Sequence, residues 1–403
     1  MSIFRRIFGA KTEARSSSTW DRMRDGYEVQ DMPLTPPLAE NLSGVFACVQ
    51  IISETIASLP LLVYRTQPDG SRIEDPVHPV ARLFYGDPNE LQTAPEWFET
   101  MTAHCLLRGN AFAEIIRDGR GAPQSLMPLH PDRVAVERIP GSNRLRYAVT
   151  GLDGGTRRLL PEEMLHLKDR SDDGILGKSR LSRARETFNT AMAVERFSGA
   201  IYRNGAKMSG FVAHPETIGP EAAKTLSDSL NSLYGGTANA GRIGVLEEGM
   251  TWHALSVSPE DAQMLESRRF SVEQIARMFR VPPPILGDLS NGSYSNVTEL
   301  GRWFAGHTIR PWLVRWEKCI TRALFSTEGR RDHVVAFDMD ELLRGDMLQR
   351  FQAYRIGREI GVYNANELRG FEGMNPRRDP AATEFLSPLN MQPEQTGAPK
   401  DGS

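Results

Sequence analysis

The segment Gly174-Ile175-Leu176-Gly177-Lys178-Ser179 is the part of this sequence that comes nearest to a catalytic motif. It falls between a predicted strand and a predicted helix, which is where a phosphate-binding P-loop lies. The first glycine of that motif would fall at Asp172, where an acid would oppose a phosphate held by free backbone N–H groups. The favoured interpretation is a loop that starts a long helix. A nucleotide-binding enzyme built on Gly177-Lys178-Ser179 is kept as the alternative.

The other residue types that perform catalysis form no recognisable pattern. The eight histidines fall in different predicted elements and no H-E-x-x-H is present, whereas a metal site needs several convergent ligands. No G-x-S-x-G sequence marks a nucleophilic serine. Cys48, Cys105 and Cys319 are far apart and form no C-x-x-C pair, which is typical of reduced core thiols in a cytosolic product. We therefore expect no enzyme activity, no metal and no cofactor.

Two groups of side chains could contact nucleic acid. Arg180, Arg183 and Arg185 open a predicted helix and could touch a phosphate backbone, although an ion-paired or solvated helix face has the same pattern. The three tryptophans between residues 303 and 316 could stack on bases. They share a helix with other apolar positions and lack interleaved lysines, which favours a core or a subunit interface. The net charge of −3 is not that of a protein that holds nucleic acid tightly.

The elements that must position these residues follow from hydrophobic periodicity. In the first half, the sequence predicts helices over residues 42–59 and 95–107 and strands over 61–64, 111–117, 133–138, 144–150 and 164–168. Alternating short strands and helices of this kind predict an α+β domain with a mainly antiparallel sheet. No apolar run approaches about 18 residues, so we expect no membrane span.

A small α/β unit separates two long predicted helices in the middle of the chain. The first helix covers residues 181–201 and ends at Asn204-Gly205. The second begins at Ser258-Pro259 and is stopped by Pro282-Pro283-Pro284, since proline lacks an N–H and clashes with the preceding turn. Between them we predict a helix over residues 222–233 and pairing of residues 242–246 with 250–255.

The chain after the prolines is predicted to form a polar loop and then a bent helix. The loop has low local stability because it contains glycines and small polar residues. A helix over residues 297–324 should kink at Pro311, and residues 333–339 read as a strand. Another helix follows over residues 347–360, and Asn364 with Glu367 makes a capping box.

Several ordered segments resemble one family. In the middle of the chain they are Arg268-Arg269-Phe270, residues 273–283 and Ser293-Tyr294-Ser295-Asn296; in the first half they are residues 45–49, 56–60, 109–112 and 129–134. Together they resemble the portal proteins of tailed phages, of the HK97 type, a family that includes portals of prophages and gene transfer agents. The usual pattern has glycine where this chain has Arg280, so the turn geometry is expected to differ there.

The resemblance implies a multidomain portal fold that assembles into a ring of about twelve copies around an axial channel. Its parts would be a flexible N-terminal arm (1–40), a wing (41–179 with the kinked helix and strand of 297–345), a stem of two helices (180–205 and 258–281), a clip (206–257), a channel loop (282–296), a crown (346–375) and a disordered tail (376–403). The residues bordering the bore would be Gly287, Asp288, Leu289, Ser290, Asn291, Gly292, Ser293, Tyr294 and Ser295.

The same resemblance implies the function and partners of a portal. Double-stranded DNA would be packaged and ejected through the channel, and the clip would bind the terminase large subunit and later the head-tail adaptor. The ring would sit at one vertex of the major capsid protein shell, after synthesis in the bacterial host cytoplasm. Affinity for duplex DNA comes mainly from cations, so a loop whose one ionised group is Asp288 favours sliding over binding. A capsid adaptor without a channel is the second alternative.

Overall fold

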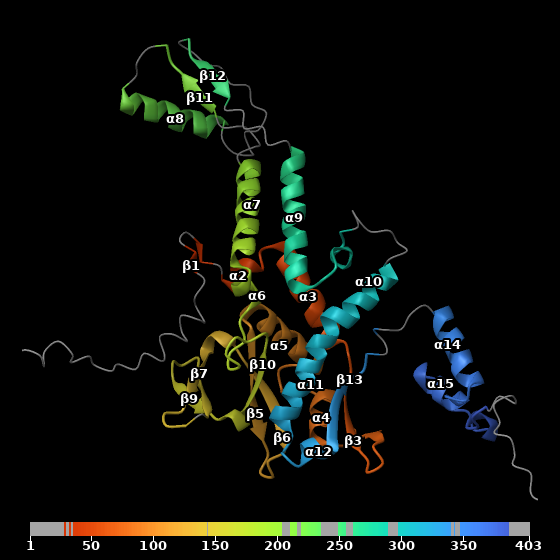
Figure 1. Ribbon diagram of the computed structural model, residues 1–403. Coiled ribbons are helices and arrows are strands. Elements are labelled where there is room, and N and C mark those ends of the chain that lie inside the picture. Colours follow the sequence, from red (N-terminus) through yellow and green to blue (C-terminus); the bar gives the residue numbers. More distant parts are fainter. Residues whose placement is uncertain are drawn as a thin grey trace, which may run out of the picture. The chain divides into compact units, whose positions relative to one another are not determined.

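A computed structural model describes residues 28–29, 32–33, 35–142, 144–203, 210–215, 219–234, 249–254, 261–288, 297–339, 342 and 347–386. The chain divides into two compact units, Met1–Asp338 and Met339–Ser403, which are described separately (Figure 1). Most of the predicted N-terminal arm and residues 387–403 of the predicted tail lie outside the described part. Both units combine helices with turns, and the first adds small antiparallel sheets, so the chain is α+β as predicted.

Three antiparallel sheets form the strand framework of the first unit. Their orders are β13-β3-β4, β10-β5-β6 and β7-β8-β9. The strands are β3 (Leu61–Thr66), β4 (Arg72–Glu74), β5 (Asn110–Arg117), β6 (Pro123–Leu129), β7 (Val134–Arg138), β8 (Leu145–Thr150), β9 (Thr156–Leu159), β10 (Met164–Lys168) and β13 (His333–Phe337). Most of these were predicted to within a residue or two, because each is an apolar run bounded by turn residues.

Helices pack on these sheets and enclose an aromatic core. They are α2 (Pro36–Ala39), α3 (Ser43–Ala57), α4 (Pro79–Tyr85), α5 (Ala94–Arg108), α11 (Arg310–Leu324) and α12 (Gly329–Asp332). Helix α11 contacts both β10 and β13 and so bridges two sheets. Trp97 and Phe98 of α5 pack on Trp316 of α11 with ring centroids 5.5 and 5.1 Å apart. The Trp316 indole donates a hydrogen bond of 3.2 Å to the hydroxyl of Thr102, which satisfies its polar atom in the core.

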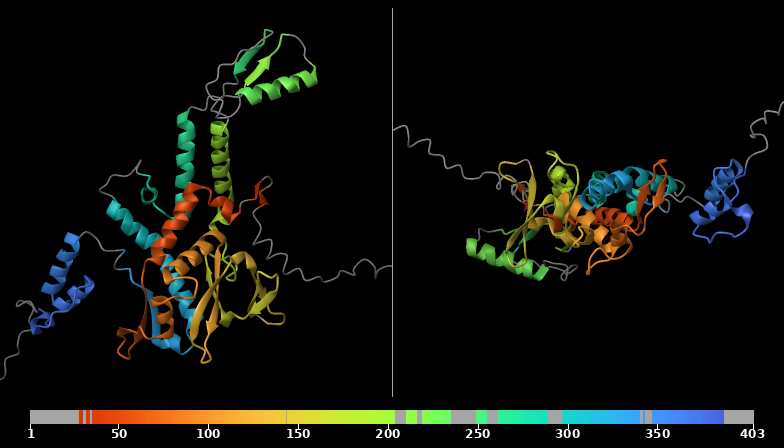
Figure 2. Two further views of the ribbon diagram at one scale, coloured as in Figure 1. Left: turned by 180° about the vertical axis from the view of Figure 1, so that it is seen from behind. Right: turned by 90° about the horizontal axis from the view of Figure 1, so that it is seen from below.

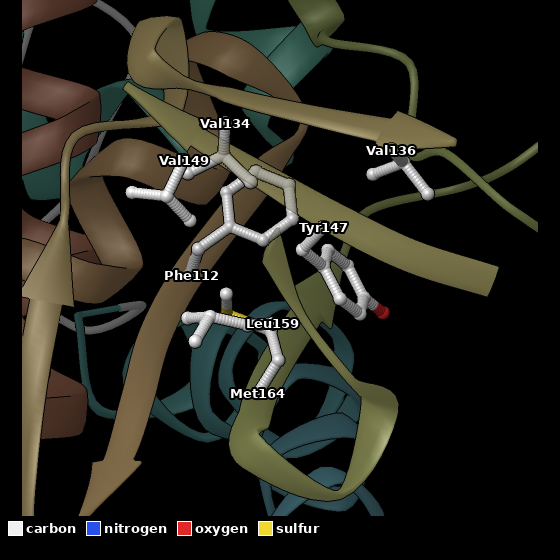
Figure 3. Close-up of a cluster of buried hydrophobic side chains, with 7 residues drawn as sticks. All are labelled: Phe112, Val134, Val136, Tyr147, Val149, Leu159 and Met164. Carbon is white, nitrogen blue, oxygen red and sulfur yellow. The ribbon is translucent and has the colours of Figure 1, made fainter. Parts of the chain in front are cut away.

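A second apolar cluster joins the β10-β5-β6 sheet to the β7-β8-β9 sheet (Figure 3). It gathers one face of β5, β7, β8, β9 and β10, and its members are Phe112, Val134, Val136, Tyr147, Val149, Leu159 and Met164. Alternate residues of β7 and β8 contribute, as expected for strands with one buried face. This cluster holds β10 in place, and β10 leads directly into the loop before the paired helices.

Two long helices lie side by side next to this framework (Figures 1 and 2). The first is broken into α6 (Arg180–Arg183) and α7 (Arg185–Arg203), and the second is α9 (Asp261–Phe279). An ion pair of 3.1 Å joins Glu195 on α7 to Arg268 on α9. At the base, Phe188 meets Phe279. The predicted starts and stops at residues 204–205 and 258–259 lie outside the described residues.

The segment between α7 and α9 contains β11 (Gly210–Ala213), α8 (Pro220–Tyr234) and β12 (Thr251–Ala254). Strand β12 pairs antiparallel with β11, a strand that the sequence analysis missed. The partner expected for it, residues 242–246, lies outside the described residues.

The helix after the channel loop is irregular one turn before Pro311. Helix α10 (Val297–Phe304) passes through a π-turn (Ala305–Ile309) into α11. Pro311 lies in the first turn of α11, where its missing N–H costs little. The sequence predicted a kink at Pro311, and the irregularity that the structure has is a π-turn upstream of the proline.

The second unit contains α14 (Met347–Glu359), α15 (Ala365–Phe371) and a short 3-10 turn at Pro380–Ala382. The predicted capping box is confirmed, because the backbone N–H of Asn364 donates to Glu367 and the N–H of Glu367 donates back to Asn364. None of the helices within the described part of the chain is long and apolar enough to cross a membrane.

Candidate functional site

The chain enters the predicted channel loop through a helix end of unusual composition. The N–H of Val281 donates to the carbonyl of Ala276 and the N–H of Arg280 donates to the carbonyl of Arg277. This pair of bonds is the Schellman motif that ends helices, with Arg280 at the position that glycine usually fills. Arg280 has a φ of 60°, the left-handed conformation that side chains disfavour. The departure noticed in the sequence is thus a strained arginine in an otherwise ordinary helix end.

A short 3-10 turn then directs the chain toward the loop. Its residues are Pro283–Leu286, and Gly287 ends it with a φ of 90°, which glycine adopts without strain. The N–H of Asp288 donates to the carbonyl of Pro283 at 3.1 Å. The rest of the predicted channel loop, residues 289–295, lies outside the described part of the chain. The prediction that it borders a bore is therefore untested.

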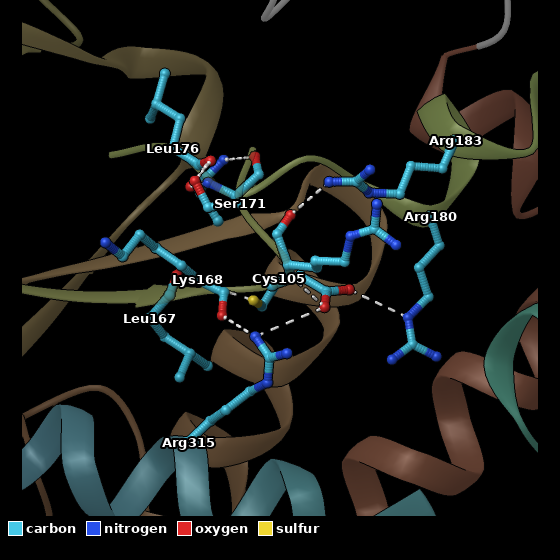
Figure 4. Close-up of polar contacts among 12 residues, drawn as sticks. Cys105, Leu167, Lys168, Ser171, Leu176, Arg180, Arg183 and Arg315 are labelled. Carbon is cyan, nitrogen blue, oxygen red and sulfur yellow. Dashed lines mark hydrogen bonds and ion pairs between the residues drawn. The ribbon is translucent and has the colours of Figure 1, made fainter. Parts of the chain in front are cut away.

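Arg180 joins three elements at the base of the paired helices (Figure 4). Its guanidinium pairs with Asp169 at 3.1 Å and donates to the carbonyls of Met278 and Phe279 at the end of α9. It also lies over the rings of Phe279 and Trp312. A cation at a helix C-terminus satisfies carbonyls that have no partner within the helix. We call this arrangement, centred on Asp169, Arg180 and Arg315, the junction cluster.

Arg315 of α11 completes the junction cluster from the opposite side (Figure 4). It donates to the carbonyl of Lys168 at 2.8 Å and approaches Asp169 at 3.8 Å. The Asp169 side chain is 7% exposed, so its charge is balanced by two guanidiniums in a largely dry place. A buried carboxylate needs such compensation to remain ionised at low cost. The cluster fixes the ends of β10, α6, α9 and α11 against one another.

Arg183 and Arg185 differ in their surroundings. Arg183 donates to Asp172 at 2.6 Å and to the carbonyl of Arg170 at 2.9 Å, and this hydrogen bond lowers the pKa of the Asp172 carboxyl. Arg185 is half-buried at the start of α7. Arg180 and Arg183 are therefore ion-paired, the second of the two interpretations that the sequence allowed. Contact with DNA stays a prediction, and for both it would require loss of these partners.

Four consecutive N–H groups of the loop that resembled a P-loop, those of residues 175–178, already donate to partners within the protein. The N–H groups of Ile175 and Leu176 donate to the carboxylate of Asp173 at 2.7 and 3.0 Å. Those of Gly177 and Lys178 donate to the Asn110 side chain and to a carbonyl at 2.8 and 3.1 Å. A phosphate cradle works through unpaired N–H groups. The paired N–H groups of residues 175–178 therefore speak against the nucleotide-binding alternative.

Two glycines explain why this loop has its sequence. A Cβ built on Gly177 would lie 2.0 Å from the carbonyl oxygen of Gly109, and one built on Gly109 would lie 2.5 Å from the nitrogen of Ser179. The backbones therefore cross at a distance that side chains would prevent. Asn110 closes the crossing, because its amide both accepts from and donates to Gly177 at 2.8 Å. The glycines of the motif thus serve packing at the start of α6.

An apolar groove lies beside the root of the channel loop. It has a volume of about 580 Å³ and is lined by Glu273, Arg277, Arg280, Val281, Pro282, Pro283, Leu300, Trp303 and His307. Trp303 is 42% exposed and stacks on His307 with centroids 4.9 Å apart. Trp312 and Trp316 are buried in the core, as the sequence favoured, but Trp303 is not. Nine residues separate Trp303 from Trp312, so at 3.6 residues per turn the two side chains point to opposite faces of the helix.

The titratable groups of the described chain show no activated nucleophile. Burial raises the pKa of the Cys48 and Cys319 thiols to about 12 and raises the pKa of Cys105 well above its usual value. Such thiols stay protonated and unreactive, as expected for core residues. Burial lowers the pKa of His104 to about 4. Among the described residues, no group of histidines, cysteines and acids could hold a metal ion.

Comparisons with known proteins define the class. The chain is 31% identical over 368 residues to the probable portal protein of Streptomyces phage phiC31, covering 89% of this chain and 80% of that one. It is 30% identical over 369 residues to the portal protein of Enterobacteria phage HK97, covering 91% and 86%. Among solved structures, it matches a chain of the neck of an empty gene transfer agent particle, computed with C6 symmetry. That match has 26% identity and a TM-score of 0.58 over 90% of this chain and 94% of the other.

The two phage relatives are portal proteins, or probable ones, that the chain matches over 80% and 86% of their lengths. The family model described as phage portal protein matches residues 43–373. The chain therefore belongs to the phage portal protein family, and its relatives place it among portals of the HK97 type. This family consists of structural proteins, which agrees with the closed state of the loop at residues 174–179.

Proposed function

We propose that copies of this chain assemble into a closed ring of about twelve around an axial channel that passes double-stranded DNA. The ring would occupy one vertex of a virion or phage-like particle, against the major capsid protein. The observation that carries the proposal is similarity to portals across nearly the whole chain. The chain is also 26% identical to a chain of the gene transfer agent neck, which was computed with C6 symmetry, and this similarity supports a ring.

The proposed domains follow the predicted boundaries. Residues 41–179 and 297–345 would form the wing, 180–205 and 258–281 the stem, 206–257 the clip, 282–296 the channel loop and 346–375 the crown. The pairing of α7 with α9, which lie on either side of β11, α8 and β12 in the chain, supports the stem and clip. The clip would bind the terminase large subunit and later the head-tail adaptor.

In the proposed ring, the junction cluster of Asp169, Arg180 and Arg315 would transmit mechanical force between the clip and the wing. Packaging force applied at the clip would reach the wing through the paired helices, because nothing else in the described chain connects them. Arg180 ties the base of both helices to β10 and α11. A rigid junction would keep the root of the channel loop in a fixed position while DNA moves past it.

The test separates a ring from the alternative of a capsid adaptor. Mass measurement and negative-stain microscopy of the purified protein should show closed rings with a central hole. Monomers or small oligomers at every salt concentration would contradict the proposal.

A second test addresses the channel itself. Replacement of Ser290, Asn291 and Ser293 by lysine should leave ring assembly intact but slow packaging, and rising salt should relieve the defect because counterion release weakens. Alanine at the same three positions is the control, since it removes the polar groups without adding charge. Unchanged DNA passage in the lysine variant at low salt would show that the loop does not line the channel.

A further inference from the structure

The second unit has almost no hydrophobic core of its own. Within residues 347–386, Gly357 and Ala382 are the buried residues of the described chain. Large apolar side chains stand exposed there instead: Met347, Leu348, Phe351, Ile356, Ile360, Val362, Phe371, Met374, Phe385 and Leu386. A small unit that buries few apolar side chains usually needs disulfides, a metal or oligomerisation to fold stably.

Two of these three solutions are absent here. The cysteines of the sequence are Cys48, Cys105 and Cys319, all outside the second unit, so no disulfide can close within it. No metal-binding group of side chains occurs in its described residues. Burial against another protein surface is the remaining source of stability.

The contacts within the unit that set its geometry are mainly polar. Arg350 on α14 forms two hydrogen bonds of 3.0 Å with Glu372, and Tyr354 donates to the same carboxylate at 2.9 Å. Gly357 lies against the ring of Tyr363, where a Cβ would meet it at 2.6 Å. These residues face α15 and orient the two helices. The Arg350 and Glu372 side chains are 21% and 13% exposed, and their paired hydrogen bonds fix the two helices without burying apolar surface.

The exposed apolar residues of α14 form two separate faces. Met347 and Phe351 lie on one face, and Ile356 and Ile360 lie about 180° away at 3.6 residues per turn. Ile360 continues the helical pattern, because its N–H donates to the carbonyl of Ile356 at 3.0 Å. The exposed ion pair of Arg355 with Glu359, at 3.6 Å, falls on the side between the two faces. The unit thus presents an apolar surface in two opposite directions.

We infer that the Met347–Phe351 face of one copy packs on the Ile356–Ile360 face of the next copy, so that the second unit completes its fold only in the ring. The inference rests on the proposed ring. A contact between two different faces is heterologous, and when its rotation closes it generates a ring. A two-fold dimer, or docking on the chain's own first unit, would use one apolar face and leave the other in water. Two opposite faces fit a neighbour on each side.

Hydrogen exchange on the full-length protein tests the inference. The amides of α14 should exchange at least about tenfold more slowly in rings than in monomers, since they would open only when the unit leaves its neighbours. Phe351→Glu and Ile356→Glu each remove one face, and both should restore fast exchange of α14 in assembled rings. Leu152→Glu is the control, because this side chain is 87% exposed in the first unit and should leave α14 unchanged.

A mixture of the two variants makes the test specific for a heterologous contact. In rings assembled from equal amounts of Phe351→Glu and Ile356→Glu chains, about one contact in four joins two intact faces. That fraction should recover slow exchange, although neither variant alone does. Slow exchange of α14 in monomers, or fast exchange in wild-type rings, would overturn the inference while the ring itself stands. Failure to form rings under any condition would overturn both.

Discussion

Replacement of Arg180 by methionine should loosen the base of the paired helices. Methionine keeps much of the apolar length that lies against Phe279 and Trp312, but it removes the guanidinium. The Asp169 carboxylate would then keep only the longer, 3.8 Å contact with Arg315 among its two arginine partners. The Asp169 carboxylate, whose side chain is 7% exposed, would lose the positive charge nearest to it.

The magnitude follows from the burial of the pair. Breaking a buried ion pair by removing one partner costs about 3–5 kcal/mol. Arg315 stays near Asp169 and the Arg180 side chain is 18% exposed, so we expect the lower end of that range. The carbonyls of Met278 and Phe279 also lose a donor, at up to about 1 kcal/mol each where water cannot replace it. A total of about 3–4 kcal/mol corresponds to a factor of about 10²–10³ in the folding equilibrium.

Urea unfolding followed by tryptophan fluorescence measures this effect, because the buried Trp312 lies beside Arg180. Arg183→Met is the matched control: it removes an arginine from the same helix, but its partner Asp172 is 55% exposed. Exposed ion pairs contribute about 1 kcal/mol or less. A loss below about 1 kcal/mol in Arg180→Met, or equal losses in both variants, would refute the role assigned to the junction cluster.

Three further predictions concern single positions. Arg280→Gly should be about 1 kcal/mol more stable than Arg280→Ala, because the left-handed φ of 60° strains any residue with a Cβ; equal thermal midpoints would contradict this. Gly177→Ala should cost about 3 kcal/mol or more, since its Cβ would lie 2.0 Å from a carbonyl oxygen. Gly306→Ala, with no neighbour within 4 Å of its Cβ, should not destabilise the protein in the same denaturant assay. Because burial lowers the pKa of His104 from 6.5 to about 4, the unfolded chain binds a proton that the folded chain does not between those values. The free energy of unfolding should therefore be highest above pH 6.5 and fall by up to about 1.4 kcal/mol per pH unit below it. His104→Gln should reduce that slope, and the part that remains should come from groups such as His166, whose pKa burial also lowers.

The sequence determined the elements because their signals are local. The strand predicted over residues 164–168 is β10, and the helix predicted over 95–107 is α5, which extends one residue further at each end. Turn residues, capping residues and prolines act within a few positions, so their effects can be read without knowledge of the fold. The family resemblance likewise came from residues that are contiguous in the chain, and it was confirmed.

The sequence could not determine what each polar side chain touches. Arg180 looked like a candidate for a phosphate backbone, yet its partners Asp169 and Phe279 lie 11 and 99 residues away. The pairing of β12 with β11 was missed because the two strands are distant in the chain. Contacts of this kind depend on how elements pack, which no local pattern encodes.

The difference between what the sequence determines and what the tertiary structure determines is clearest in two places. They are the helix that carries the tryptophans and the loop before α6. The sequence alone established an apolar helix from its spacing, but only the tertiary structure decided that Trp312 is buried while Trp303 stands exposed beside a groove. It also established a Gly177-Lys178-Ser179 loop between a strand and a helix. Only the tertiary structure decided that the loop is closed, because Asn110 takes the N–H of Gly177 and the backbone of Gly109 lies against it. Local sequence sets which conformations are available, and long-range packing decides which groups are left to bind a partner.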